Sequence, residues 1–252
     1  DLKYLRQIHD ATIVKVGEKA KGEPAVMGFS MGGWYTLNLA ATGAPEEYSN
    51  ALAINPPLDL NTGLRMLDKL FRKPAGEENL QTIKASALVK LLASQQRSAE
   101  QDILPFSDQE ASYIIGLSYR LTLTQTIMAS LDITPSSKSH KKIGTLGWED
   151  YYSKIVAPAL AARKINPEAL DRASNLRTRE AGLAAAKNLR LVLTGNDFLL
   201  TQEDLAWFRK RFPDNRTVYT ETGGHMGQLW KPKVRTSIRA AIRRNQSVSS
   251  SN

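Results

Sequence analysis

The 252-residue chain contains no cysteine, only three histidines and few aromatic residues, which make up 7% of it. The absence of cysteine excludes disulfide bonds, thiolate metal sites and a cysteine nucleophile, but it does not identify the cellular compartment, which stays open. No stretch approaches the roughly 18 uncharged apolar residues that a membrane-spanning helix needs. Apolar residues still form 42% of the chain and charged residues 23%, which is typical of a globular protein with a substantial core.

Positive charge is concentrated near the C-terminal end. The formal net charge is +9, and residues 231–244 contain six cations and no acid. Aromatic residues are not interleaved with these cations, as a stacking surface for bases requires, so we expect no nucleic-acid partner. We interpret the segment as a solvated terminal helix, with peripheral contact of Lys231–Arg244 to an anionic surface as the alternative.

Strand and helix patterns alternate at both ends of the chain. Apolar periodicity predicts strands over residues 25–29, 50–57, 189–195 and 216–221, with helices over 2–19, 31–42 and 202–212. About 130 residues of helical pattern separate the second strand from the third, too many for an ordinary crossover. We therefore predict an α/β fold, a mostly parallel sheet with flanking helices. Its core would comprise residues 1–58 and 187–252, and residues 59–186 would form an inserted helical cap.

The stretch "GFSMG" places Ser30 between glycines, directly after the first predicted strand. This pattern is the nucleophile elbow, in which a serine occupies a strained turn between a strand and a helix. The small neighbouring residues let the turn close, and the hydroxyl then projects above the sheet. The backbone N–H of Met31 would supply one oxyanion-hole donor.

A serine nucleophile needs a histidine later in the chain. His225 follows the last predicted strand in "GGHMG", where the flanking glycines let the imidazole reach over a neighbouring strand end. His9 precedes the serine and therefore has the wrong order. His140 lies in the polar, cation-flanked stretch "SSKSHKKIG", which favours solvent exposure. His225 is the candidate base.

The matching acid should lie between the serine and the histidine. Asp197 follows the third predicted strand in "TGND", and Asp204 is its rival seven residues later. Thr201 and Asp204 form a T-x-x-D capping pattern, which gives Asp204 a structural role at the start of a helix. We therefore favour Asp197.

The motifs "GFSMGG", "GND" and "GGHMG" resemble those of the α/β-hydrolase superfamily and span residues 28–227. The resemblance implies that Ser30 attacks an acyl carbonyl, His225 takes its proton and Asp197 orients the imidazole, with no metal and no cofactor. The strands that precede the elbow in that family, and the loop that donates a second oxyanion N–H, have no counterpart here. We expect a missing N-terminal segment of the same protein to supply them.

The function predicted in this way is a serine hydrolase that cleaves the carboxylic ester of a small-molecule acyl substrate. The large helical insertion favours hydrophobic acyl or lipid esters, with Tyr119, Met128 and Trp148 as candidate pocket residues or as ordinary packing residues. Two alternatives stay open. One is a serine peptidase or amidase of the same fold, and the other is a non-catalytic protein that binds apolar ligands and has a basic docking helix.

Overall fold

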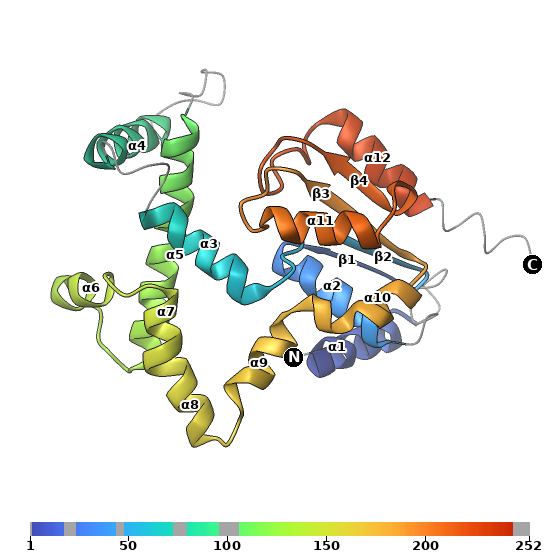
Figure 1. Cartoon of the computed structure of the whole chain (residues 1–252), viewed down its shortest axis with the longest axis horizontal. Helices are drawn as coiled ribbons and strands as arrows, with labels where there is room; N and C mark the ends of the chain where they lie inside the picture. The colour runs from blue at the N-terminus through green and yellow to red at the C-terminus, as the bar shows by residue number, and fades with distance from the viewer. Residues whose placement is uncertain (1, 18–23, 44–47, 73–79, 96–105, 244–252) are drawn as a thin grey trace, which may run out of the picture. The chain divides into compact units, whose positions relative to one another are not determined.

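The computed structural model describes residues 2–17, 24–43, 48–72, 80–95 and 106–243, the side chains of residues 241–243 excepted (Figure 1). Two compact units make up the chain. Residues 1–63 and 171–252 form the first, which we call the sheet unit, and residues 64–170 form the second, the helical unit. No helix of the described residues is long and apolar enough to cross a membrane.

The sheet unit contains a four-stranded parallel sheet in the order β1-β2-β3-β4. Helices connect the successive strands, as the alternating pattern predicted. The predicted α/β fold with a parallel sheet is therefore confirmed. The strands are β1 (Ala25–Phe29), β2 (Asn50–Ile54), β3 (Leu189–Thr194) and β4 (Thr217–Thr220). The helices are α1 (Leu2–Val16), α2 (Met31–Thr42), the first residues of α3 (Leu60–Arg72), the last residues of α9 (Pro167–Ser174), η3 (Leu176–Arg179), α10 (Glu180–Ala185), α11 (Gln202–Arg211), η4 (Asp214–Arg216) and α12 (Pro232–Arg243).

Successive side chains of β2 and β3 point to opposite faces of the sheet, because a strand has a period of two residues. One face carries Ala53 and Leu191, which pack in a large cluster with residues of α2, α10 and α11. The other face carries Ile54 and Val192, which pack against Ile238 of α12. Both faces are thus covered by helices, which explains why β2 is buried at every position.

One edge of the sheet is apolar and exposed. β1 lies at the end of the strand order, and Met27 and Phe29 are 54% and 43% exposed. The helix α1 has no buried residue, and Tyr4, Ile8 and Val14 are among its exposed large hydrophobics. An exposed apolar edge strand of this kind has backbone N–H and C=O groups that can pair with another strand.

The helical unit is organised around the long helix α5 (Asp108–Ser130). A capping box at Ser107 and Glu110 begins α5, and Arg120 within it forms a buried ion pair of 2.7 Å with Asp68 of α3. A second cluster lies around Met128, against which Tyr119 and Trp148 pack. The other helices are α4 (Leu80–Gln95), α6 (Ser137–Ile143), α7 (Trp148–Tyr151), η2 (Tyr152–Val156) and α8 (Ala157–Ala162), with the remainder of α3 and the start of α9.

The end of the helical region differs from the prediction. The sequence placed it at residue 186, whereas the second unit ends at residue 170. Leu176, Leu183 and Ala186 are buried in the same cluster as Trp34 and Leu37 of α2. Residues 171–186 are therefore helical but belong to the core of the sheet unit, because their apolar side chains cover the sheet.

Candidate active site

Ser30 lies at the turn between β1 and α2, with φ 52° and ψ −120°. A non-glycine residue rarely adopts such angles, and they store backbone strain. The Ser30 N–H donates to the carbonyl of Ile54 at 2.9 Å, which ties the turn to the end of β2. Ser30 occupies the N-cap of α2, yet its side chain makes no capping hydrogen bond. The hydroxyl is thus not used in the way that N-cap serines usually are.

The glycines around Ser30 have different roles. A Cβ at Gly28 would come within 2.1 Å of the Gly32 carbonyl oxygen, so only glycine fits there. A Cβ at Gly33 would lie 3.2 Å from the carbonyl oxygens of Gly28 and Ile54, which is a tight contact. At Gly32 nothing lies within 4 Å of a Cβ. The close approach of β1 and α2 thus depends on Gly28 and Gly33.

Asp197 follows β3 and is held by three groups. Its side chain is fully buried. Oδ1 accepts the backbone N–H of Leu199 at 2.9 Å, and Oδ2 accepts the amide of Asn55 at 3.0 Å. Hydrogen bonds of this kind fix the orientation of the carboxylate.

His225 supplies the third contact of Asp197. Its Nδ1 lies 2.9 Å from Oδ2 and 3.1 Å from Oδ1, so the tautomer with a proton on Nδ1 donates to the carboxylate. The His225 side chain is 9% exposed, and its ring centroid lies 5.3 Å from that of Phe198. Asn196 accepts the N–H of Gly224 at 2.8 Å and so links the acid loop to the histidine loop. This arrangement leaves Nε2 available as a proton acceptor.

The structure brings Asp197 and His225 into contact and places Ser30 at the same end of the sheet, where the carboxyl ends of the parallel strands lie. Ser30 follows β1 and Asp197 follows β3, so two spacings between strands, roughly 10 Å, separate their backbones. An imidazole bound to Asp197 can span part of that distance. Within the described residues, neither the Ser30 hydroxyl nor Nε2 of His225 forms a hydrogen bond. Catalytic hydrogen bonds are often long without substrate and shorten in the complex.

Sequence reasoning missed Asn55, which is 1% exposed at the end of β2. Its amide donates to Asp197 and also to the Thr194 hydroxyl at 3.1 Å, and its φ is 46°. Asparagine tolerates this left-handed conformation better than most residues. The signal was a lone polar residue between an apolar strand and two prolines, at the carboxyl end of a strand.

The rival candidates have other roles. Thr201 and Asp204 form a reciprocal capping box at the start of α11, as the T-x-x-D pattern predicted, and Asp204 also pairs with Arg177 at 2.7 Å. His140 is exposed in α6, with its Nδ1 2.8 Å from the Ser136 carbonyl oxygen. His9 lies in α1, beside Asp10. None of these histidines or acids contacts the Asp197–His225 pair.

Met31 is the first residue of α2 and is 58% exposed. Backbone N–H groups in the first turn of a helix have no acceptor within the helix, so the N–H of Met31 has no partner inside α2. No group of three or more potential metal ligands occurs in the described part of the chain.

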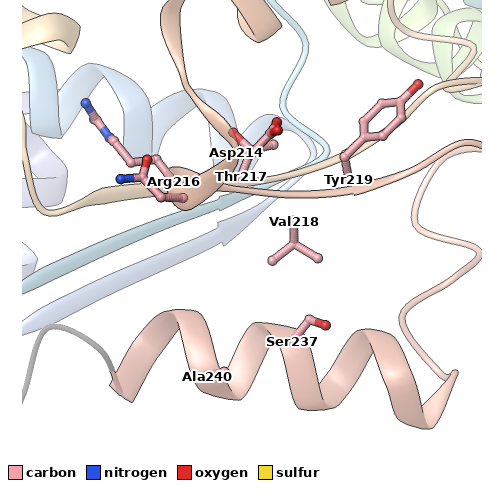
Figure 2. A pocket seen from close by; sticks show the side chains of 8 residues that line it. Asp214, Arg216, Thr217, Val218, Tyr219, Ser237 and Ala240 are labelled. Atoms are coloured by element: carbon pink, nitrogen blue, oxygen red, sulfur yellow. The ribbon is translucent and has the colours of Figure 1, made fainter.

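The sheet unit also has a hollow of about 330 Å³ between β4 and α12, with Val218 and Ser237 on its two sides (Figure 2). Neither Ser30 nor His225 lines it. In the helical unit, a hollow of about 370 Å³ is lined by Trp148 and otherwise by charged residues, among them Arg65 and Asp68. The lining of that hollow is not that of an apolar acyl pocket.

No family model matches the sequence, and no curated protein matches it. Among solved structures, the chain is similar to a thioesterase domain from the curacin biosynthetic pathway. The identity is 14% and the TM-score 0.34, and the match covers 92% of this chain and 71% of that one. Because that score is low, no functional argument follows from this likeness.

Proposed function

We propose that this protein is a serine hydrolase that cleaves carboxylic esters through Ser30, His225 and Asp197. The observation that carries the proposal is the buried Asp197 carboxylate bound to Nδ1 of His225. This contact fixes the tautomer whose Nε2 can accept a proton. The strained turn at Ser30, with a hydroxyl that caps no helix, supports the same assignment.

In the proposed reaction, Nε2 of His225 removes the proton of the Ser30 hydroxyl as the oxygen attacks the ester carbonyl carbon. The oxyanion that forms is stabilised by the N–H of Met31. The imidazolium then gives its proton to the departing alcohol, which leaves an acyl-serine. Water attacks this acyl group as His225 takes one of its protons, and the imidazolium returns that proton to the Ser30 oxygen as the acid is released. Asp197 stays ionised throughout and stabilises the imidazolium.

Asn55 is a positioning residue in this proposal. Its amide holds Oδ2 of Asp197, the oxygen that lies closest to Nδ1 of His225. The carboxylate therefore cannot rotate away from the imidazole without breaking a buried hydrogen bond. A change at Asn55 should act on catalysis through the orientation of His225 rather than through substrate binding.

A second oxyanion donor and a partner for the β1 edge are both part of the proposal. The expected N-terminal segment of the same protein would pair with β1 and contribute that donor. The exposed Met27 and Phe29, together with the apolar surface of α1, support this expectation. The role of the helical unit as a cap stays a prediction. So does the role of Tyr119 and Met128 as pocket residues, because these two side chains pack in the core of that unit.

The test is labelling with a fluorophosphonate probe, which reacts only with an activated serine. We expect labelling of the wild-type protein at Ser30, and none of Ser30→Ala. Asp197→Asn should label much more slowly, because the imidazole loses its orienting carboxylate. Asp204→Asn is the matched control, since Asp204 caps α11 and should affect stability but not labelling.

Three outcomes bear on the assignment. If the native full-length protein were not labelled, the non-catalytic alternative would be favoured. If it were labelled, p-nitrophenyl esters of rising acyl length compared with aminoacyl amides would separate an esterase from a peptidase or amidase. Equal labelling of Ser30→Ala and wild type would refute the proposed nucleophile.

A further inference from the structure

The sheet unit carries a strongly basic surface around the start of α12. Lys231, Lys233, Arg235 and Arg239 are all exposed, and the sequence contains no acid between residues 231 and 244. Trp230, directly before them, is 70% exposed, with the Lys231 ammonium 5.9 Å from its ring centroid. We call these five residues the basic surface.

The charge of the basic surface is not neutralised by the protein. Within the described residues, none of its four cations forms an ion pair. Glu221 lines the same hollow of about 400 Å³ as Lys231 and Lys233, and Asp214 lines the hollow at the other end of β4. Even with both acids counted, the four exposed cations leave a positive surplus, so the surface should attract anions.

The helix that carries the basic surface is fixed to the sheet. Val234 is 6% exposed, and Ile238 packs against Leu52, Ile54 and Val192. The apolar side of α12 is therefore used within the fold and cannot insert into another phase. Trp230 is the large apolar side chain that stays free beside the cations.

We propose that the basic surface docks this protein on bilayers that contain anionic lipids. Lysine and arginine near an anionic bilayer are attracted to its headgroups. Tryptophan favours the depth of the headgroups, where its ring is partly buried and its N–H can form hydrogen bonds. A single aromatic residue at one end of the cations fits this arrangement better than a stacking surface for a single-stranded nucleic acid, in which aromatic side chains are interleaved with cations. The docking does not depend on the proposed hydrolase activity.

The expected size of the effect follows from the number of cations. Each lysine or arginine close to the bilayer strengthens binding about fivefold, which is about 1 kcal/mol at about 1.4 kcal/mol per tenfold change. Removing three cations should thus weaken binding about 100-fold. Raising the salt concentration from about 0.1 M to about 1 M should also weaken it, since the screening length falls from about 10 Å to about 3 Å.

The experiment is co-sedimentation of the full chain with vesicles of phosphatidylcholine, with and without phosphatidylserine. We expect binding to the anionic vesicles and little binding to the neutral ones. The triple variant Lys233→Gln, Arg235→Gln, Arg239→Gln should lose about 100-fold in affinity. The matched control is the triple variant Lys138→Gln, Lys141→Gln, Lys142→Gln, which removes three exposed cations of α6 and should bind as wild type does. Thermal unfolding of both triple variants checks that they fold.

Trp230→Ala separates a lipid surface from a general polyanion. It should weaken binding to anionic vesicles and leave binding to a double-stranded DNA fragment unchanged. Three results would overturn the proposal: equal binding to both kinds of vesicle, equal losses in the two triple variants, or DNA binding as tight as vesicle binding with no effect of Trp230→Ala on vesicles.

Discussion

Replacing Ser30 by glycine should stabilise the sheet unit while it abolishes any activity of the site. Ser30 has φ 52° and ψ −120°, and a non-glycine residue in such a sparsely populated region costs about 1–3 kcal/mol. Glycine adopts these angles freely, but it adds conformational entropy to the unfolded chain worth about 0.5–1 kcal/mol. The net gain for Ser30→Gly should therefore be about 1 kcal/mol.

Ser30→Ala is the matched control for this prediction. Alanine removes the hydroxyl and keeps the Cβ, and thus keeps the backbone strain. The Ser30 side chain makes no capping hydrogen bond to α2, so its loss in Ser30→Ala should change the stability little. Both variants should be inactive, and only Ser30→Gly should be more stable than wild type.

Differential scanning calorimetry of wild type and both variants measures the effect. A gain of about 1 kcal/mol corresponds to a rise in Tm of about 2–4 °C for a domain of this size. The rise should appear in the transition of the sheet unit, which contains Ser30. If Ser30→Gly unfolded at the same temperature as Ser30→Ala, or below it, the strain inferred at the elbow would be refuted.

Three further predictions concern other positions. Gly28→Ala should destabilise the sheet unit strongly, because the new Cβ would lie 2.1 Å from the Gly32 carbonyl oxygen. Gly32→Ala has open space around the new Cβ, so it should be neutral or stabilising by up to about 1 kcal/mol. Chemical denaturation of both variants measures the difference. Equal losses in both would contradict the steric argument. Asn55→Gly keeps the backbone at φ 46° unstrained but removes a buried hydrogen bond to Asp197, so the free energy of unfolding should fall by about 1.5–3 kcal/mol. In steady-state kinetics, kcat should fall with KM nearly unchanged. A change in KM alone would exclude the positioning role. Hydrogen bonds from Lys90 and Ser86 lower the pKa of Glu110 to about 2, so its stabilising effect should be complete above the unfolded value near 4.3 and be lost as the pH falls toward 2. Glu110→Gln should therefore be less stable than wild type at pH 7, and the difference should shrink in acid. Urea unfolding of both proteins at several pH values measures this difference, and a difference that does not depend on pH would contradict the linkage.

The sequence alone determined the local elements of the sheet unit. Apolar runs between glycines and prolines predicted β1 and α2 with the bounds that the structure has, because short-range sterics and periodicity act within a few residues. The position of the candidate serine, acid and histidine, each after a strand and in that order, also followed from the sequence. In a parallel sheet the carboxyl ends of all strands lie at the same end of the sheet, so residues that follow these strands lie near one another although they are far apart in the chain.

Only the tertiary structure decided which side chains touch. Asn55 had no motif to identify it, and its role depends on β2 lying beside β3, so that its amide reaches Asp197. The assignment of residues 171–186 to the sheet unit likewise depends on which surface Leu176 and Leu183 cover, and an amphipathic pattern does not specify its partner. The sequence set the identity and local conformation of the candidate residues, because those depend on neighbours along the chain. The contacts that orient an imidazole within a few tenths of an ångström depend on packing across strands, which a single sequence does not encode in any local pattern.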